Sequence, residues 1–265
     1  MKSFVERVLK QPAIAGVART AMDWVDLQFT YVVDGLARYA PRARGKLLDV
    51  GCGDKPYEYL FTPHVDEYIG VEYSSTYELT AAGARNKADV LYDGEKLPFE
   101  DASFDTVINV QVLEHTPHPQ RLLSEIGRVL KPGGVLILSA PFSFRLHEEP
   151  HDYFRYSPHG MRELMGNAGI SIEEIHPQGG LWSLVAHKLN SYMALNMARV
   201  GQMAQVTGKC GHEKTADAPT RAWLLPFIAP AMVVNATGAR ILDRFLPDPT
   251  ETMGFTVLAR RNSTG

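Results

Sequence analysis

The chain has 265 residues and a formal net charge of −3, with 45% hydrophobic and 22% charged residues. These proportions are ordinary for a soluble globular protein, and the lack of a Lys/Arg cluster argues against a nucleic-acid binder. The two cysteines, Cys52 and Cys210, indicate a reducing compartment without a disulfide framework. The first ten residues lack the apolar core of a secretory signal, so we expect a cytoplasmic protein.

Residues 1–45 are predicted to form an N-terminal helical segment, because apolar side chains recur every three or four residues up to Leu36. From Lys46 onward, short apolar runs alternate with helical stretches, a pattern typical of a parallel sheet covered on both faces. Helices are expected at 120–130 and 161–168, the first closed by Lys131-Pro132-Gly133-Gly134. The predicted strands are 47–50, 67–72, 88–92, 104–109, 135–139, 170–175 and 254–261.

Residues 181–248 are predicted to be a helical insertion within an α/β domain that comprises 46–180 and 249–265. Its most apolar tract, 223–234, contains two prolines and is too short to span a bilayer, which needs about 20 apolar residues. Three roles stay open for the insertion. The first is packing against the core or against a second subunit, as in a homodimer. The second is a lid over an apolar acceptor, and the third is a peripheral contact with a membrane surface.

The most informative stretch is Asp49-Val50-Gly51-Cys52-Gly53-Asp54, where an apolar strand enters a glycine turn. Glycine lacks a Cβ, so the backbone can turn sharply there and approach a ligand closely. Glu72 ends the next predicted strand, about 20 residues on, where a carboxylate can accept both hydroxyls of a ribose. Asp93 follows the third strand, where it can accept a hydrogen bond from an adenine amino group.

The same stretch distinguishes between nucleotide cofactors. The dinucleotide fingerprint requires a third glycine three positions after the second, and this chain has Pro56 there. Asp49 and Asp54 would repel a pyrophosphate, whereas a cationic sulfonium with an amino-acid tail would suit them. A nicotinamide-dependent oxidoreductase is therefore the less favoured alternative.

With these motifs, the chain resembles the class I methyltransferases of the small-molecule type (type 11) that includes the ubiquinone-biosynthesis methyltransferases. The resemblance covers roughly residues 46–180, and it implies a Rossmann-like, seven-stranded, mostly parallel sheet with an antiparallel last strand and helices on both faces. It also implies S-adenosylmethionine as the methyl donor. Besides the glycine turn and Glu72, it rests on Leu97-Pro98-Phe99-Glu100-Asp101-Ala102-Ser103-Phe104-Asp105, Val112-Leu113-Glu114-His115 and Arg128-Val129-Leu130-Lys131-Pro132-Gly133-Gly134.

The resemblance also assigns positions around the cofactor. It implies Gly51 and Gly53 beside the methionine part, Glu72 on the ribose and Asp93 near the adenine. The stretch from Asn109 to His115 lies beside the methionine and the acceptor in such enzymes. We expect the cofactor to be bound by Asp49, Gly51, Cys52, Gly53, Glu72, Tyr73, Asp93, Gly94 and Gln111.

Methyl transfer from a sulfonium is an in-line displacement in which positioning supplies most of the rate, and a hydroxyl acceptor also benefits from a general base such as histidine. His115 is a candidate base because the resemblance puts it near the acceptor; a structural role at a strand end is the alternative. Residues 147–156 follow the fifth strand at the edge where ligands of open α/β sheets bind. This segment contributes the catalytic candidates His147 and His151 and an acceptor wall of Asp152, Tyr153, Arg155 and Tyr156.

The alternative for this segment is a solvated loop that caps the next helix through Ser157-Pro158. The spelling His147-Glu148-Glu149-Pro150-His151 is also that of a zinc peptidase, which needs a helix to place both histidines on one face. Pro150 would disrupt such a helix, and no third ligand follows, so we expect no metal.

The sequence thus predicts a cytoplasmic methyltransferase acting on a hydroxyl of a small molecule, of a sugar, lipid-linked or polyketide type. Methyl transfer to nitrogen or carbon stays open, and so does a catalytically silent, methyltransferase-like partner subunit.

Overall fold

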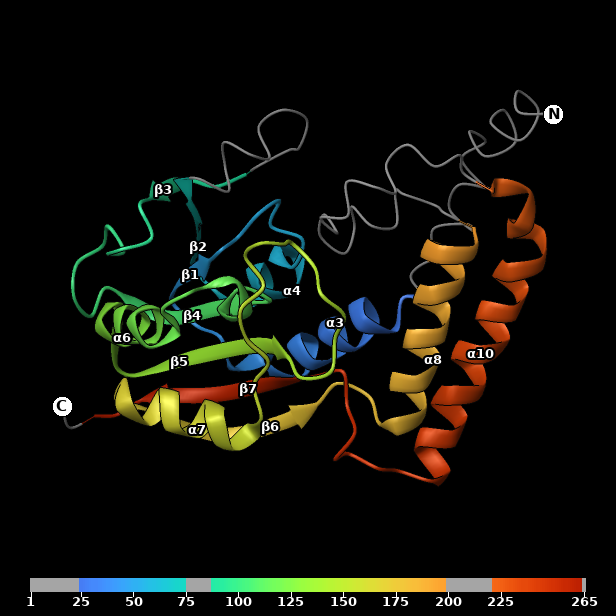
Figure 1. Cartoon of the computed structure of the whole chain (residues 1–265). Coiled ribbons are helices and arrows are strands. Elements are labelled where there is room, and N and C mark those ends of the chain that lie inside the picture. Colours follow the sequence, from blue (N-terminus) through green and yellow to red (C-terminus); the bar gives the residue numbers. More distant parts are fainter. Residues whose placement is uncertain (1–23, 75–86, 199–220, 264–265) are drawn as a thin grey trace. The chain divides into compact units, whose positions relative to one another are not determined.

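The computed structural model describes residues 24–74, 87–198 and 221–263 of the chain (Figure 1). The chain divides into two compact units. One consists of residues 32–178 with 254–265, and the other of residues 1–31 with 179–253.

The first unit is built on a seven-stranded sheet in the order β3-β2-β1-β4-β5-β7-β6 (Figure 1). Strands β1 to β5 pair in parallel, whereas β7 runs antiparallel to both β5 and β6. This confirms the predicted mostly parallel, Rossmann-like sheet with an antiparallel last strand. The strands are β1 Lys46–Val50, β2 Glu67–Tyr73, β3 Val90–Tyr92, β4 Phe104–Val110, β5 Leu130–Pro141, β6 Ile170–Pro177 and β7 Gly254–Arg261.

Helices cover both faces of this sheet. On one face, α6 (Pro119–Val129) and α7 (Pro158–Asn167) pack against the strands. The other face carries the part of α3 (Leu27–Tyr39) that follows Tyr31, together with the short α4 (Glu58–Phe61). Successive side chains of a strand point to opposite faces, so Leu48 joins the first core and Leu47 the second.

Strand β5 is longer than the sequence predicts. The stop signal Lys131-Pro132-Gly133-Gly134 does end α6, at Val129, but the chain stays within the sheet. Leu130 pairs with Phe104, and regular pairing resumes with Val135 opposite Thr106. Gly133 takes a positive φ of 72°, the left-handed conformation that favours glycine. The signal thus ends a helix without ending the regular structure.

Arg128 explains why two distant motifs occur together. Its guanidinium donates to the carboxylates of Glu125 and Asp101 and to the carbonyls of Leu97 and Phe99. A guanidinium has five N–H donors in a fixed plane, so a single side chain can hold a whole loop. Arg128 thereby fixes the turn before β4 against α6.

The described part of the second unit is helical, with α8 at Leu181–Tyr192, a π-helical turn η4 at Met193–Met197, a 3-10 turn η6 at Ala222–Leu224 and α10 at Leu225–Phe245. These elements fall within the range that we predict as a helical insertion. Residues 199–220 of that range, and residues 1–23 of the predicted N-terminal helical segment, lie outside the described residues.

Helix α10 corrects the length expected for the apolar tract. It has 21 residues and continues to Phe245 with Pro230 inside, so the argument that the tract is too short for a bilayer is wrong. Of the described helices, α10 alone is long and apolar enough to cross a membrane, and 22% of its most apolar window is buried. Core helices of soluble proteins also meet this test, so length and composition do not assign α10 to a membrane.

The start of α8 is capped by a side chain from α10. Gly180 precedes the helix and has no side chain that could accept from the first free N–H groups. The Asp243 carboxylate accepts instead from the N–H groups of Gly180, Trp182 and Ser183 at 3.1, 3.0 and 3.0 Å. A long-range carboxylate therefore replaces the usual local cap.

Replacing Asp243 should destabilise this helical pair. In Asp243→Ala the N–H groups lose their acceptor, and we expect a loss of about 1–2 kcal/mol in the free energy of unfolding. Asp243→Asn keeps one accepting oxygen and should lose less. Urea denaturation of the three proteins measures the difference, and an unchanged midpoint for Asp243→Ala would contradict this account of the cap.

Candidate active site

The candidate site lies at the carboxyl edge of the sheet, where β1, β4 and β5 end. Strand β1 has β2 on one side and β4 on the other, so the strand order reverses between β1 and β4. Ligands of open α/β sheets bind at such a reversal. The loops that follow β1, β4 and β5 are the three segments in which the sequence places its candidate residues.

The glycine turn after β1 needs its glycines. Gly51 and Gly53 have φ values of 78° and 48°, in the left-handed region. A Cβ on Gly51 would lie 2.4 Å from the Val112 side chain, so glycine lets this turn approach the segment after β4. A Cβ on Gly53 would meet nothing within 4 Å, which leaves open space beside the backbone where a cofactor can lie.

Glu72, at the end of β2, has the geometry expected of a ribose ligand. Its carboxylate accepts from the backbone N–H of Gly53 at 2.8 Å and of Tyr73 at 2.9 Å, and it is only 7% exposed. Burial raises the pKa of Glu72, while the two N–H groups oppose that shift. A carboxylate offers about four accepting positions, so roughly two are left for a pair of ribose hydroxyls. The residues thus fit the cofactor that the fold implies.

Asp49 and Cys52 lie beneath the glycine turn. Asp49 is buried and accepts a 2.6 Å hydrogen bond from the hydroxyl of Tyr68. Burial raises its pKa to about 7, against the lowering effect of that hydrogen bond. The Cys52 thiol is also buried and packs beside Gly70. Both side chains support the turn from below, and their direct contact with the cofactor stays a prediction.

The ends of β2 and β3 bring together the residues expected around the adenine. Tyr73 is 42% exposed, and its ring lies against Gly94, whose φ is 83°. Asp93 is exposed and accepts from the N–H groups of Glu95 and Lys96, which lower its pKa. These groups form a small platform of one aromatic ring and one carboxylate.

The chain leaves β4 through a constrained turn. Gln111 has a φ of 56°, unusual for a residue other than glycine, and its side chain donates to Ser139 Oγ at 2.9 Å. The backbone N–H of Gln111 donates to the Ser139 carbonyl. The turn leads directly into a 3-10 helix, Leu113–His115. Backbone strain of this kind is concentrated at functional sites.

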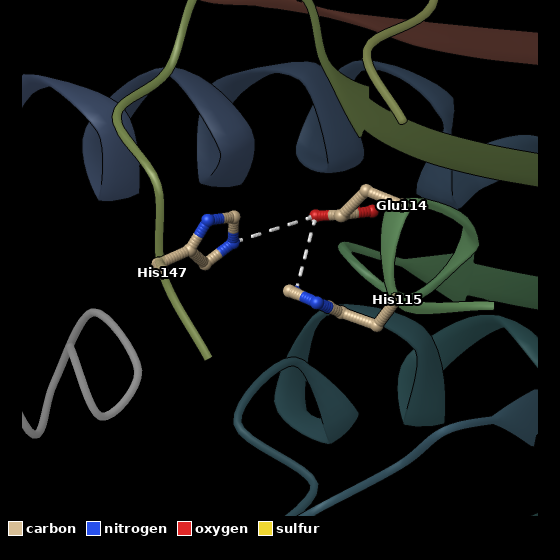
Figure 2. Close-up of side chains that lie close together, drawn as sticks. All are labelled: Glu114, His115 and His147. Carbon is tan, nitrogen blue, oxygen red and sulfur yellow. Dashed lines mark ion pairs between the residues drawn. The ribbon is translucent and has the colours of Figure 1, made fainter. Parts of the chain in front are cut away.

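Three titratable side chains converge behind this turn, namely Glu114, His115 and His147 (Figure 2). His115 Nε2 lies 3.8 Å from Glu114 Oε1, and His147 Nε2 lies 4.0 Å from the same oxygen. The two imidazole rings meet edge to face, with centroids 4.6 Å apart. The turn after β4 and the loop after β5 thus contribute to one cluster.

Glu114 is the most unusual member of this cluster. It has no exposed surface, and neither carboxylate oxygen has a hydrogen-bond partner among the described residues. Burial raises its pKa to about 8, against the weaker influence of its own backbone and of Arg155. The sequence motif contained Glu114, but we did not place it among the site residues. Its position directly before a candidate catalytic histidine was the signal that could have identified it.

The two histidines are oriented by their outer nitrogens. His115 Nδ1 lies 2.8 Å from the His151 carbonyl, and His147 Nδ1 lies 3.2 Å from the Arg145 carbonyl. A carbonyl only accepts hydrogen bonds, so each Nδ1 carries the proton and each Nε2 presents a lone pair. Burial, together with the neighbouring His115, lowers the pKa of His147 to about 4, which keeps it neutral.

The expected acceptor wall divides into buried and exposed members. Asp152 and Arg155 form a two-point ion pair at 2.5 and 2.7 Å, and although burial opposes it, Arg155 lowers the pKa of Asp152 to about 2. Tyr156 is buried and donates to the Leu113 carbonyl at 3.0 Å. These three residues hold the loop and the 3-10 turn in place. His151 and Tyr153 are exposed and hydrogen-bonded to each other.

The loop after β5 also approaches the cofactor side. Glu148 lies 3.7 Å from His115 Nε2, and its charge raises the pKa of Glu72. The segment has no helix before Pro158, as the argument from Pro150 predicts. Ser157 caps α7 by accepting from the Gly160 N–H, so the capping expected for Ser157 is confirmed. This loop therefore places Glu148 beside the histidine cluster, where its charge also acts on Glu72, and it caps a helix.

Comparison with known proteins identifies the class. Residues 48–138 match the methyltransferase domain family. A probable S-adenosylmethionine-dependent methyltransferase of Mycolicibacterium smegmatis is 32% identical over 148 residues, which are 52% of this chain and 56% of that protein. An uncharacterized methyltransferase of Mycolicibacterium paratuberculosis is 40% identical over 115 residues, 41% of this chain and 45% of the relative. The chain spans about half the length of these relatives.

Among solved structures, the [4+2]-cyclase SpnF is similar, with a TM-score of 0.51 and 18% identity over 87% of this chain and 79% of that one. At this identity the likeness shows the fold alone. The domain match, the strand order and the methyltransferase relatives agree with one another. Residues 48–138 are therefore a class I, S-adenosylmethionine-dependent methyltransferase domain.

Removing the Glu72 carboxylate should weaken cofactor binding. Hydrogen bonds to a charged group contribute about 1.5–3 kcal/mol, so Glu72→Ala should bind S-adenosylhomocysteine at least about tenfold more weakly. Glu67→Ala, at the opposite end of β2, is the matched control and should bind like the unchanged protein. Calorimetric titration measures both, with NAD as a non-binding ligand. Equal affinity of Glu72→Ala and the control would remove Glu72 from the cofactor site.

The buried Asp49 should make stability depend on pH. Its pKa is raised from the ordinary 3.8 to about 7, so between these values the folded protein binds more protons than the unfolded chain. Stability contributed by Asp49 is therefore fully present below about pH 4 and is lost as pH rises toward 7, by up to about 1.4 kcal/mol per unit.

In Asp49→Asn the side chain is an amide, which does not bind or release a proton in this pH range. Between about pH 5 and pH 8 this variant should lose less stability than the unchanged protein, as measured by urea denaturation at each pH. Asp54→Asn, at an exposed position of the same turn, should follow the unchanged protein. Parallel pH curves for Asp49→Asn and the unchanged protein would refute the raised pKa.

Proposed function

We propose that the protein transfers a methyl group from S-adenosylmethionine to a hydroxyl of a small-molecule acceptor. The observation that supports this is the cluster of Glu114, His115 and His147 beside the glycine turn. An amine or an acidic carbon needs little help to accept a methyl group, whereas a hydroxyl must lose its proton. Groups that present lone pairs to the acceptor are what a hydroxyl requires.

The residues of this chain divide the work between binding and proton handling. Gly51, Gly53 and Glu72 would hold the cofactor, which supplies an electrophilic methyl group on sulfur. The contact of Val112 with the glycine turn puts the 3-10 helix next to that position. His115 and His147 carry unprotonated Nε2 atoms beside the Glu114 carboxylate, and this cluster would handle the proton that an acceptor hydroxyl loses. Holding donor and acceptor in line in this way can supply most of the rate.

The nature of the acceptor beyond its hydroxyl is supported by the sequence alone, which favours a sugar, lipid-linked or polyketide-type metabolite. His151 and Tyr153 are exposed members of the loop after β5 that could contact such a molecule. We further propose a cytoplasmic location, because Cys52 is a free, buried thiol typical of a reducing compartment.

Two rival functions share the fold. SpnF, a cyclase by name, illustrates that this architecture also supports reactions other than methyl transfer. A catalytically silent partner subunit would bind cofactor without turning over. The buried carboxyl of Glu114, which has no hydrogen-bond partner among the described residues, argues against it, since retaining such a group costs stability and a silent subunit would gain nothing from it.

The test of the proposed function is the atom that receives the methyl group. The protein is incubated with S-adenosylmethionine carrying a ¹³C-labelled methyl group and with a small-molecule extract, and the products are examined by NMR. We expect a new ¹³C signal in the methoxy region, absent from a Glu72→Ala control. Signals in the N-methyl or C-methyl region would assign the alternative acceptors. Cofactor binding without any labelled product would support the silent subunit.

A further inference from the structure

We propose that Glu114, His115 and His147 form a binding site for a divalent transition-metal ion of the Zn²⁺ type. The three potential ligand atoms lie within 4.8 Å of one another (Figure 2). Two imidazoles and one carboxylate are the set found in catalytic zinc sites that keep positions open for a substrate. This proposal replaces our expectation from the sequence that the chain binds no metal.

The Glu114 carboxylate is unsatisfied within the described part of the chain. Glu114 is completely buried, and the described residues provide no hydrogen-bond partner for either of its oxygens. Buried polar groups are nearly always satisfied, so an exception needs an explanation such as an ion. Glu114 Oε1 faces the Nε2 atoms of both histidines, which are themselves potential ligands. A cation placed among the three would satisfy all of them together.

The two imidazoles have the orientation expected of metal ligands. In metal sites, a ligating histidine donates its other N–H to a carbonyl or carboxylate, which fixes the tautomer and the ring. His115 does so to the His151 carbonyl, and His147 does so to the Arg145 carbonyl, with Asp152 Oδ2 3.3 Å from the same nitrogen. Both rings therefore direct an unprotonated Nε2 at the carboxylate.

These outer contacts are anchored firmly. Asp152 also accepts from the His147 backbone N–H at 3.0 Å and is held by the two-point pair with Arg155. Such support is expected where a ligand must be kept in one orientation. The carboxylate–histidine arrangement would not be required if His147 only filled space between loops.

The spacing agrees with an ion after a small adjustment. Ligand atoms at about 2.0–2.2 Å from one tetrahedral ion lie roughly 3.3–3.6 Å apart. The separations of 3.8 and 4.0 Å from Glu114 Oε1, and of at most 4.8 Å between the two imidazole nitrogens, require each side chain to move by less than about an ångström. Imidazole favours Zn²⁺, Co²⁺ or Fe²⁺ over Mg²⁺ and Ca²⁺, which prefer oxygen ligands throughout. The proposed site does not use the zinc-peptidase motif, because the second histidine of that motif, His151, contacts the cluster only through its backbone carbonyl.

The consequence for the reaction rests on the proposed function. An acceptor hydroxyl bound at an open position of the ion would have its pKa lowered and would release its proton to solvent water. The acceptor oxygen would then form a bond to the methyl carbon while the sulfur–carbon bond breaks. The electron pair of the broken bond stays on sulfur, which becomes a neutral thioether.

The test measures the metal without cofactor or acceptor. Untagged, chelator-treated protein is titrated with Co²⁺, followed by visible absorption, and with Zn²⁺, followed by calorimetry. We expect one ion per chain and competition between the two metals. Glu114→Gln and His147→Ala should weaken binding by roughly 100-fold or more, as expected for loss of a ligand. His159→Ala, an exposed histidine on α7, is the matched control and should bind normally.

A second measurement uses the unaltered protein and so does not depend on how well the variants fold. In the Co²⁺ form, proton NMR should show two strongly shifted, exchangeable signals from the Nδ1–H groups of two ligating histidines. No saturable Co²⁺ or Zn²⁺ binding, or binding unchanged in both ligand variants, would overturn the proposal.

The two proposals can fail separately. Metal binding at this cluster combined with methylation of nitrogen or carbon would uphold the site and refute the hydroxyl acceptor. Conversely, undiminished methylation of oxygen by a protein that binds no metal would uphold the proposed function and refute the site.

Discussion

The reversal of strand order between β1 and β4 is the constraint on which the rest of the structure depends. The connection after β1 passes over one face of the sheet through α4, and the connection after β4 passes over the other through α6. The two loops therefore separate at the carboxyl edge, which is where a ligand can enter. Because Gly51 has no side chain, the loop after β1 approaches Val112 in the loop after β4 closely. The glycine turn therefore lies next to the segment that carries the candidate acceptor residues.

Behind that position the protein retains a buried polar cluster where an apolar core would be more stable. An unpaired buried carboxyl costs about 1–3 kcal/mol, and Glu114 has this cost without any hydrogen bond of its own among the described residues. The surrounding contacts offset it. Tyr156 holds the Leu113 carbonyl, and the pair of Asp152 and Arg155 holds the loop after β5. Local instability maintained by a well-fixed surrounding shell is typical of functional sites.

Most of the sheet could be predicted because each strand carries its own signal. The periodicity of apolar residues identifies buried strands, and the helices between them predict the parallel pairing of β1 to β5. The two errors have physical causes. At β5, the Pro-Gly-Gly stop is compatible with an extended chain, so Leu130 pairs with β4 before regular pairing begins. At α10, Pro226 occupies the first turn, where its missing N–H is harmless. On either side of Pro230, Ile228 and Met232 are buried in an apolar cluster, and this packing favours a continuous helix past the proline.

The sequence by itself predicted the cofactor half of the candidate site, because the glycine turn, the acidic residue that ends the next strand and their spacing all follow from local strand-and-turn chemistry. Only the tertiary structure decided the acceptor half. Glu114 and His147 are separated in the chain by α6 and β5, and no local periodicity records that the ends of β4 and β5 bring them within 4.0 Å. The same holds for the direction of each imidazole, which depends on backbone carbonyls that the sequence does not specify. Contacts set by neighbours along the chain can be predicted from it, whereas contacts between loops depend on how the sheet places their ends.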